Sequence, residues 1–197
     1  MSPTDPTDVE SYDEELAKVV IGELQPLSQP IEIREYDPEW PRLYTREETR
    51  IRSALGKRTI RLEHAGSTSV SGLPAKPLID IVLEVPDSAD EPSYVPDLEA
   101  AGYILRIREP DWYEHRVFKG PPDTNVNVHT FSAGCEEVDR MLLFRDWLRT
   151  NDADRELYAS AKRELAARNW KYVQQYADAK TEVVTAIMER AHAAASA

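Results

Sequence analysis

The apolar run at residues 78–85 (LIDIVLEV) constrains the fold of this chain most strongly, because its length and composition are typical of a buried β-strand. Successive side chains of a strand point to opposite faces, so Asp80, Val82 and Glu84 share one face. A carboxylate in an apolar strand is costly unless it is paired or binds a metal. Asp80 is therefore a candidate metal ligand, and the competing interpretation is a structural carboxylate satisfied by backbone N–H groups or by Lys76.

The other hydrophobic patterns predict most of the strands first and a helical part after them. Helices are expected at about 38–55 and 93–101, and again at about 136–149, 153–168 and 177–194. Strands are expected at 31–36, 59–64 and 102–107, and a hairpin at 112–119 and 124–131. This layout indicates an α+β or mixed α/β fold.

The chain divides into three predicted parts. Residues 1–10 are proline-rich and polar, which predicts a disordered tail. Residues 11–29 read as a helical arm and linker that opens with the capping-box pattern Ser11-x-x-Glu14. Residues 30–197 form one domain, helical from about residue 136.

Charge and composition argue against several classes of partner. The net charge of −12 opposes polynucleotide binding, because phosphate contacts dominate that affinity. No apolar run approaches the roughly 20 residues of a membrane-spanning helix, and the N-terminus lacks the pattern of a secretory signal. The lone Cys135 agrees with a reducing compartment. We therefore expect a cytoplasmic protein with no membrane partner, and the sequence identifies no protein partner.

A short polar segment after the strand at 59–64 could bind phosphate. Gly66 lets the backbone turn tightly, and Ser67, Thr68 and Ser69 offer hydroxyl and backbone N–H groups in succession. If a helical turn starts here, its free N–H groups point toward a bound anion. The competing interpretation is a plain turn or helix cap.

The second strand of the predicted hairpin carries polar side chains on one face. Asn125, Asn127 and His129 alternate with apolar residues, which is poor strand chemistry unless that face lines a polar site. If this strand neighbours the Asp80 strand, Asp80 and His129 could bind one divalent metal. The alternative for His129 is a hydrogen-bonded core histidine.

The segment at 64–81 resembles the hallmark of the GrpB family, through His64-Ala-Gly-Ser-Thr-Ser-Val70, Gly72-Leu-x-Ala-Lys76-Pro and Ile79-Asp-Ile81. Further blocks support the resemblance in order along the chain: residues 36–41 (YDPEWP), 126–129 (VNVH), 144–149 (FRDWLR) and 176–180 (YADAK). The likeness covers residues from about 13 to about 190.

This resemblance implies a nucleotidyltransferase-like fold, with a small mixed sheet, helices on one side and a C-terminal helical cover. It implies a nucleoside triphosphate partner and transfer of a nucleotidyl group to an acceptor that the sequence does not identify. Asp80 would bind Mg²⁺ or Mn²⁺. The phosphate-binding residues would be Gly66, Ser67, Thr68 and Ser69, with positive charge from Lys76, Arg140, Arg145 and Lys180.

One departure from the superfamily pattern concerns catalysis. The usual second carboxylate, two residues after the first, is Val82 here. Glu84 shares the face but lies about 13 Å along the strand from Asp80, too far to share an ion. A non-catalytic nucleotide-binding or regulatory module is therefore the second interpretation, and a scaffold with a structural Asp80 is the third.

Overall fold

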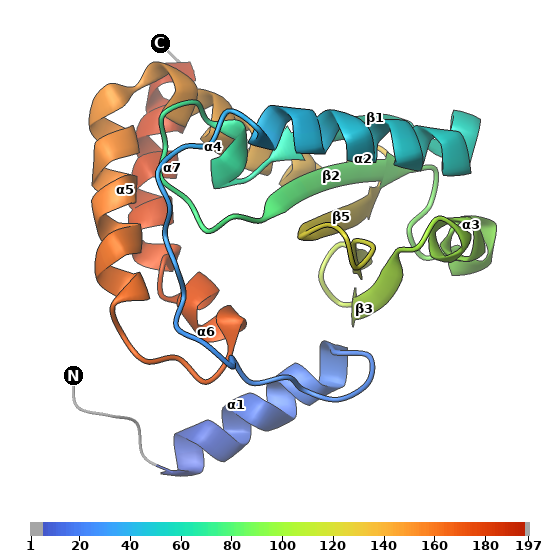
Figure 1. Ribbon diagram of the computed structural model, residues 1–197, viewed down its shortest axis with the longest axis horizontal. Helices are drawn as coiled ribbons and strands as arrows, with labels where there is room; N and C mark the ends of the chain where they lie inside the picture. Colours follow the sequence, from blue (N-terminus) through green and yellow to red (C-terminus); the bar gives the residue numbers. More distant parts are fainter. Residues whose placement is uncertain (1–5, 196–197) are drawn as a thin grey trace.

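The computed structural model describes residues 6–195, which form a sheet with helices around it (Figure 1). The sheet is mixed and five-stranded, with strand order β1-β2-β5-β4-β3. Only the central pairing of β2 with β5 is parallel, and the other pairings are antiparallel. The strands are β1 (Arg61–Ala65), β2 (Ile79–Val85), β3 (Ile104–Glu109), β4 (His115–Lys119) and β5 (Val126–Ser132).

The register places the predicted polar positions side by side. Asp80 of β2 pairs with Asn127 of β5, and Val82 pairs with His129. Because side chains alternate along both strands, these residues share one face of the sheet. The two strands are therefore neighbours, which is the condition on which a shared Asp80–His129 metal site depends.

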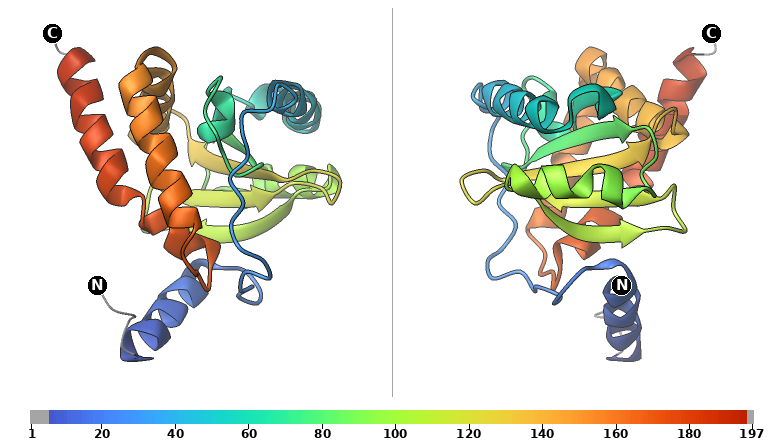
Figure 2. Two further views of the ribbon diagram at one scale, coloured as in Figure 1. Left: turned by 60° about the vertical axis from the view of Figure 1, so that its left-hand side comes forward. Right: turned by 90° about the vertical axis from the view of Figure 1, so that its right-hand side faces the viewer.

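One face of the sheet carries the largest hydrophobic core. Helices α2 (Trp40–Leu55) and α3 (Val95–Ala100) pack on this face, and α2 runs along the sheet in Figures 1 and 2. Ile81, Phe118 and Val128 are fully buried in this core. The alternate residues of β2 and β5 are therefore left to the opposite face.

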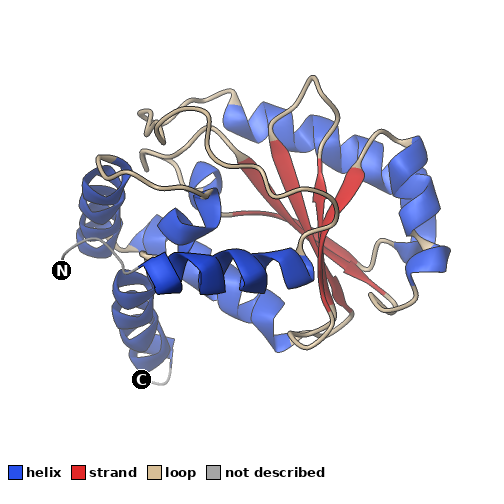
Figure 3. Cartoon of the chain, turned by 90° about the horizontal axis from the view of Figure 1, so that it is seen from below, coloured by secondary structure: helices blue, strands red, loops and turns tan. Residues whose placement is uncertain are grey.

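The opposite face is covered in part by α4 (Glu136–Thr150), whose Val138 and Leu142 pack on Val82 and Phe131. Beyond α4, helices α5 (Asp152–Ala166) and α7 (Thr181–Ala195) stand side by side next to the sheet, with the short α6 (Val173–Asp178) below them (Figures 1 and 2). Figure 3 shows the strands as one twisted sheet with helices on more than one side. Strand β2 begins on the side that faces α5 and α7 (Figure 1). The mixed sheet and the C-terminal helices next to it confirm the expected mixed α/β fold with a C-terminal helical cover.

Short 3₁₀ helices complete the described secondary structure. They are η1 (Gly56–Arg58), η2 (Ser67–Ser69) and η3 (Glu91–Ser93). Within residues 6–195, no helix is long and apolar enough to cross a bilayer.

The N-terminal arm differs from its predicted bounds. Residues 1–5 of the expected disordered tail lie outside the described residues, whereas α1 (Pro6–Val19) already begins at Pro6. Proline is compatible with the first turn of a helix, because that turn needs no N–H donor. The helix ends before Val20, which forms a β-bridge to Ile107. Gly22 then takes a φ of +88°, and residues 20–29 of the expected arm and linker are not helical.

Two other expectations are wrong in detail. Residues 31–36 form no strand, only one β-bridge from Arg34 to Ala75. Pro77 follows two residues after Ala75 and has no N–H with which to extend a ladder. The expected break at 169–175 contains the start of α6 at Val173.

Candidate functional site

Asp80 lies near the start of β2 with its carboxylate partly open to solvent. Its side chain is 25% exposed, and Oδ1 lies 3.5 Å from Nε2 of His129. Nδ2 of Asn127 donates a hydrogen bond of 3.3 Å to the same oxygen. Asp80 thus has polar neighbours on β5, but these neighbours do not seal it inside the protein.

Gly66 faces this carboxylate at the end of β1. Its backbone has φ +64° and ψ −175°, a conformation that is essentially confined to glycine. A Cβ built on Gly66 would stand 2.5 Å from Oδ2 of Asp80. The close approach of the turn to the carboxylate therefore requires glycine at this position.

The polar turn after Gly66 forms η2, and its side chains are used unequally. Thr68 is buried, and its hydroxyl donates to the carbonyl of Leu78 at 3.0 Å. The hydroxyl of Ser69 donates to the carbonyl of Gly66 at 2.6 Å. Within the part of the chain that the structure describes, the Ser67 hydroxyl makes no hydrogen bond. Ser67 is therefore the turn residue whose hydroxyl is left for a ligand.

His64 supports this turn from inside the core. Its Nε2 lies 3.0 Å from the Thr68 hydroxyl, and its ring stacks on Tyr44 with centroids 4.9 Å apart. Burial lowers the pKa of His64 to about 4, so the ring is neutral at pH 7. His64 is therefore a structural residue of the turn.

Three lysines affect the charge of Asp80 or of one another: Lys76 in the loop before β2, Lys119 on β4 and Lys180 in the turn between α6 and α7. The Lys119 ammonium donates to Oδ1 of Asn127 at 2.6 Å. Burial, and then the charge of Lys119, lower the pKa of Lys76, with a further contribution from Lys180. Lys76 and Lys180 are two of the expected residues, whereas Lys119 was not expected. Its signal in the sequence is its position on the hairpin strand next to Asn127.

The charge state of Asp80 follows from these neighbours. Burial raises the pKa of its carboxyl, but the hydrogen bond and charge of His129 and the charge of Lys180 outweigh burial. The pKa of Asp80 therefore lies below its ordinary value, and the group is a carboxylate at neutral pH. An anionic group bordered by lysines suits a ligand that combines a cation with phosphates.

Arg145, from the set of expected cations, is committed to internal contacts. Its guanidinium donates to Glu63 at 2.9 Å, to the carbonyl of His64 at 3.0 Å and to Asp146 at 2.8 Å. These contacts tie α4 to β1 and do not reach the Asp80 carboxylate. Arg145 therefore has a structural role, because it holds α4 against the end of β1 that leads into the turn.

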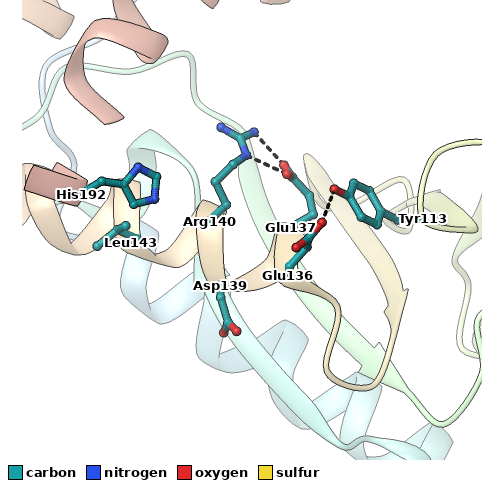
Figure 4. Close-up of a pocket in the computed structure, with 7 residues that line it drawn as sticks. All are labelled: Tyr113, Glu136, Glu137, Asp139, Arg140, Leu143 and His192. Carbon is teal, nitrogen blue, oxygen red and sulfur yellow. Dashed lines mark hydrogen bonds and ion pairs between the residues drawn. The ribbon is translucent and has the colours of Figure 1, made fainter. Parts of the chain in front are cut away.

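Arg140 lies in a different part of the molecule. Its guanidinium forms a two-bond ion pair with Glu137, at 2.6 and 2.7 Å. It lines a cavity of about 470 Å³ together with Tyr113, Glu136, Glu137, Asp139, Leu143 and His192 (Figure 4). Asp80 is not among the residues that line this cavity, so the structure does not bring Arg140 to the expected site.

The metal-binding capacity of the site rests on two side chains. Among residues 6–195, no three His, Cys, Asp or Glu side chains are grouped to hold one metal ion. Val82 is fully buried against α4, and Glu84 accepts a hydrogen bond of 3.1 Å from the Gly134 N–H. The side chains that remain as candidate cation ligands are those of Asp80 and His129, which are 25% and 22% exposed. They fit a cation whose other ligands are water and phosphate oxygens.

Two further residues of this face were not predicted from the sequence pattern. His115 of β4 lies next to His129, with Nε2 3.2 Å from Nδ1. Glu109 of β3 lies 2.7 Å from Nδ1 of His115. Their strand pairing, which sets these contacts, cannot be derived from the alternation of a single strand.

Comparison with known proteins finds one family over most of the chain. The model of the family described as GrpB protein matches residues 30–190. A UPF0157 protein of Halalkalibacterium halodurans is 62% identical over 181 residues, which is 92% of each chain. A UPF0157 protein of Streptomyces coelicolor is 44% identical over 169 residues, covering 86% of this chain and 88% of that one.

Structural and more distant similarities agree with this result. The crystal structure of conserved protein GrpB from Enterococcus faecalis matches with a TM-score of 0.71 and 27% identity, over 81% of this chain and 96% of that one. A protein of Mycobacterium tuberculosis named dephospho-CoA kinase is 32% identical over 171 residues. This match covers 73% of the present chain but only 42% of the mycobacterial protein.

Proposed function

Because this chain belongs to the GrpB family, we propose that it binds a nucleoside triphosphate with a divalent cation at Asp80 and transfers the nucleotidyl group to an acceptor. One observation carries the proposal: the Gly66 turn faces a partly exposed carboxylate, and a Cβ on Gly66 would stand 2.5 Å from it. In this arrangement the turn can bind phosphate oxygens while the carboxylate binds a cation that neutralises them. The fold of the family agrees with this use.

Each group of the site has a role in this proposal. The Ser67 hydroxyl and the backbone N–H groups of Ser67 and Thr68 bind phosphate oxygens, because the N–H of Ser69 already donates to the Gly66 carbonyl. Asp80 and His129 hold Mg²⁺ or Mn²⁺, which when bound supplies charge neutralisation at the phosphates. Lys76, Lys119 and Lys180 offset the charge of the departing pyrophosphate. An acceptor nucleophile attacks the α-phosphorus, the α–β phosphoanhydride bond breaks, and pyrophosphate leaves with the bonding electrons.

A second candidate function is nucleotide binding without transfer. Val82 occupies the position of the usual second carboxylate and is fully buried, so the site offers one carboxylate to a cation. Two-metal phosphoryl chemistry needs carboxylates around both ions. Relatives named dephospho-CoA kinase contain a similar segment in less than half of their length, which is compatible with a binding module joined to an enzyme.

Calorimetry with each nucleoside triphosphate tests the proposal, in Mg²⁺, in Mn²⁺ and in a chelator. We expect metal-dependent binding that Asp80→Asn abolishes. Asp90→Asn is the matched control, because Asp90 is exposed and precedes η3 rather than lying on the Asp80 face.

Pyrophosphate release separates the two candidate functions. Release in the presence of an acceptor supports transfer, and binding without release under any acceptor supports the module. If the unmodified protein binds no triphosphate under any metal condition, both candidates are wrong and Asp80 is structural.

A further inference from the structure

Four side chains form one continuous row across the polar face of the sheet. Glu109 of β3 contacts His115 of β4, which contacts His129 of β5, which faces Asp80 of β2. The successive distances between nitrogen and oxygen, or between two nitrogen atoms, are 2.7, 3.2 and 3.5 Å. The strand order β2-β5-β4-β3 puts one member of the row on each strand.

The two imidazole rings meet edge to edge. Their planes are parallel within 2°, and their centroids are 5.3 Å apart while Nε2 of His115 and Nδ1 of His129 are only 3.2 Å apart. Rings in face-to-face contact would have closer centroids, so this geometry is that of a hydrogen bond in a common plane.

The ring of His115 is held in place by packing as well. It lies against Phe131, with centroids 4.6 Å apart, and Trp112 meets it edge-on at 5.0 Å. Its side chain is 6% exposed. Because the ring is buried and packed on both sides, it is held in one orientation toward Glu109 and His129.

These contacts fix where the protons lie. A carboxylate only accepts hydrogen bonds, so the bond to Glu109 places a proton on Nδ1 of His115. Neutral His115 then carries a lone pair on Nε2, which accepts the Nδ1–H of His129. In its neutral form His129 then carries a lone pair on Nε2, the atom that faces Asp80 at 3.5 Å, whereas in its charged form it donates an Nε2–H to that carboxylate. In the neutral form two electron-pair donors thus face each other, an arrangement that a proton or a metal ion between them stabilises.

We propose that Glu109 and His115 are positioning residues that hold His129 as its Nδ1–H tautomer, so that its Nε2 and the Asp80 carboxylate together coordinate a divalent transition-metal ion. The metal part of this inference rests on the proposed nucleotide site, whereas the tautomer does not. A nitrogen ligand held in this form favours a transition-metal ion over Mg²⁺. Carboxylate–histidine pairs of this kind orient metal-binding imidazoles in many proteins.

Histidine-labelled protein tests the tautomer without metal or nucleotide. Long-range ¹H–¹⁵N NMR at pH 8 should show a protonated Nδ1 and a bare Nε2 for both His115 and His129. His115→Phe, which keeps a ring between Phe131 and Trp112, should remove the preference at His129. A proton on Nε2 of His129 in the unmodified protein would overturn the proposal.

Manganese binding tests the consequence. Titration followed by the electron paramagnetic resonance signal of free Mn²⁺, with Mg²⁺ as competitor, should show Mn²⁺ affinity about 10- to 100-fold lower in His115→Phe and Glu109→Gln. The competition should show that Mg²⁺ affinity changes less. His192→Phe on α7 and Glu99→Gln on α3 are the matched controls and should bind as the unmodified protein does.

The outcomes separate this inference from the proposed function. If His115→Phe and Glu109→Gln both fold, as judged by circular dichroism, and both keep the Mn²⁺ affinity of the unmodified protein, the positioning role is contradicted even if nucleotides bind. Absence of triphosphate binding contradicts the proposed function, while the tautomer measured by NMR still decides the role of Glu109 and His115.

Discussion

The Asp80 carboxylate lies directly over the backbone of Gly66, so that a Cβ on the glycine would stand 2.5 Å from Oδ2. The pair joins the end of β1 to the start of β2, where Ala65 and Asp80 are partners in the antiparallel ladder. The glycine thereby lets the backbone of the turn approach a charged group closely. This contact places the turn and the carboxylate side by side, as the proposed site requires.

Gly66→Ala should remove the site by two separate effects. The backbone φ of +64° strains any other residue by about 1–3 kcal/mol, and the added methyl also collides with the carboxylate. We expect a loss of unfolding free energy of roughly 2–4 kcal/mol and no measurable triphosphate binding. Urea denaturation and calorimetry measure the two quantities.

Gly56→Ala provides the control for backbone strain. Gly56 has a φ of +56°, and a Cβ there would meet nothing within 4 Å. This variant should lose about 1–2 kcal/mol of stability and bind nucleotide normally. Equal effects of the two alanine variants would show that the contact with Asp80 has no role of its own.

The sheet could be predicted from the sequence because its strands carry strong local signals. The apolar run at 78–85 matches β2 (Ile79–Val85), and the turn at Gly120 to Asp123 separates β4 from β5. The segment at 31–36 shows the limit of this reasoning. Residues 31–36 alternate as a strand does, but they pair only through the bridge from Arg34 to Ala75. The partner segment then reaches Pro77, which has no N–H to continue the ladder. Only the tertiary contact decides that outcome.

The site was predictable as far as single strands allow. Alternation placed Asp80 and His129 on polar faces, and the parallel register then brought them within 3.5 Å. His115 could not be assigned in the same way, because the β3–β4 and β4–β5 pairings determine its two partners. Arg145 was expected near phosphates because of its charge, whereas burial commits it to Glu63 and the His64 carbonyl.

Arg145→Met should destabilise the protein without changing the intrinsic affinity for nucleotide. The variant removes buried charged hydrogen bonds that join α4 to β1, which we expect to cost about 2–3 kcal/mol. Arg140→Met is the comparison, because its ion pair with Glu137 is partly solvated, and should cost below about 1 kcal/mol. Urea denaturation measures both. A large loss of triphosphate affinity in folded Arg145→Met would instead assign the residue to the ligand.

The lysines around Asp80 should contribute to triphosphate affinity in a salt-dependent way. We expect Lys76→Met, Lys119→Met and Lys180→Met each to lower affinity by about 3- to 10-fold at low salt, and less at high salt. Lys57→Met, at an exposed position of η1, is the control. Calorimetry at two salt concentrations measures the effect. Equal affinities for all four variants would contradict a phosphate role for these lysines.

His64 should make the stability of the protein depend on pH between neutrality and about pH 4. Burial lowers the pKa of this ring from 6.5 to about 4, so the unfolded chain binds a proton in this range and the folded chain does not. The stabilising contribution is therefore complete above pH 6.5, falls as the pH decreases and is lost at about pH 4, a change of about 3 kcal/mol. His64→Phe keeps a ring against Tyr44 and should lose this part of the pH dependence, whereas His192→Phe should retain it. Urea denaturation from pH 7.5 to pH 4 measures the difference. If His64→Phe follows the same pH profile as the unmodified protein, a group other than His64 causes the pH dependence.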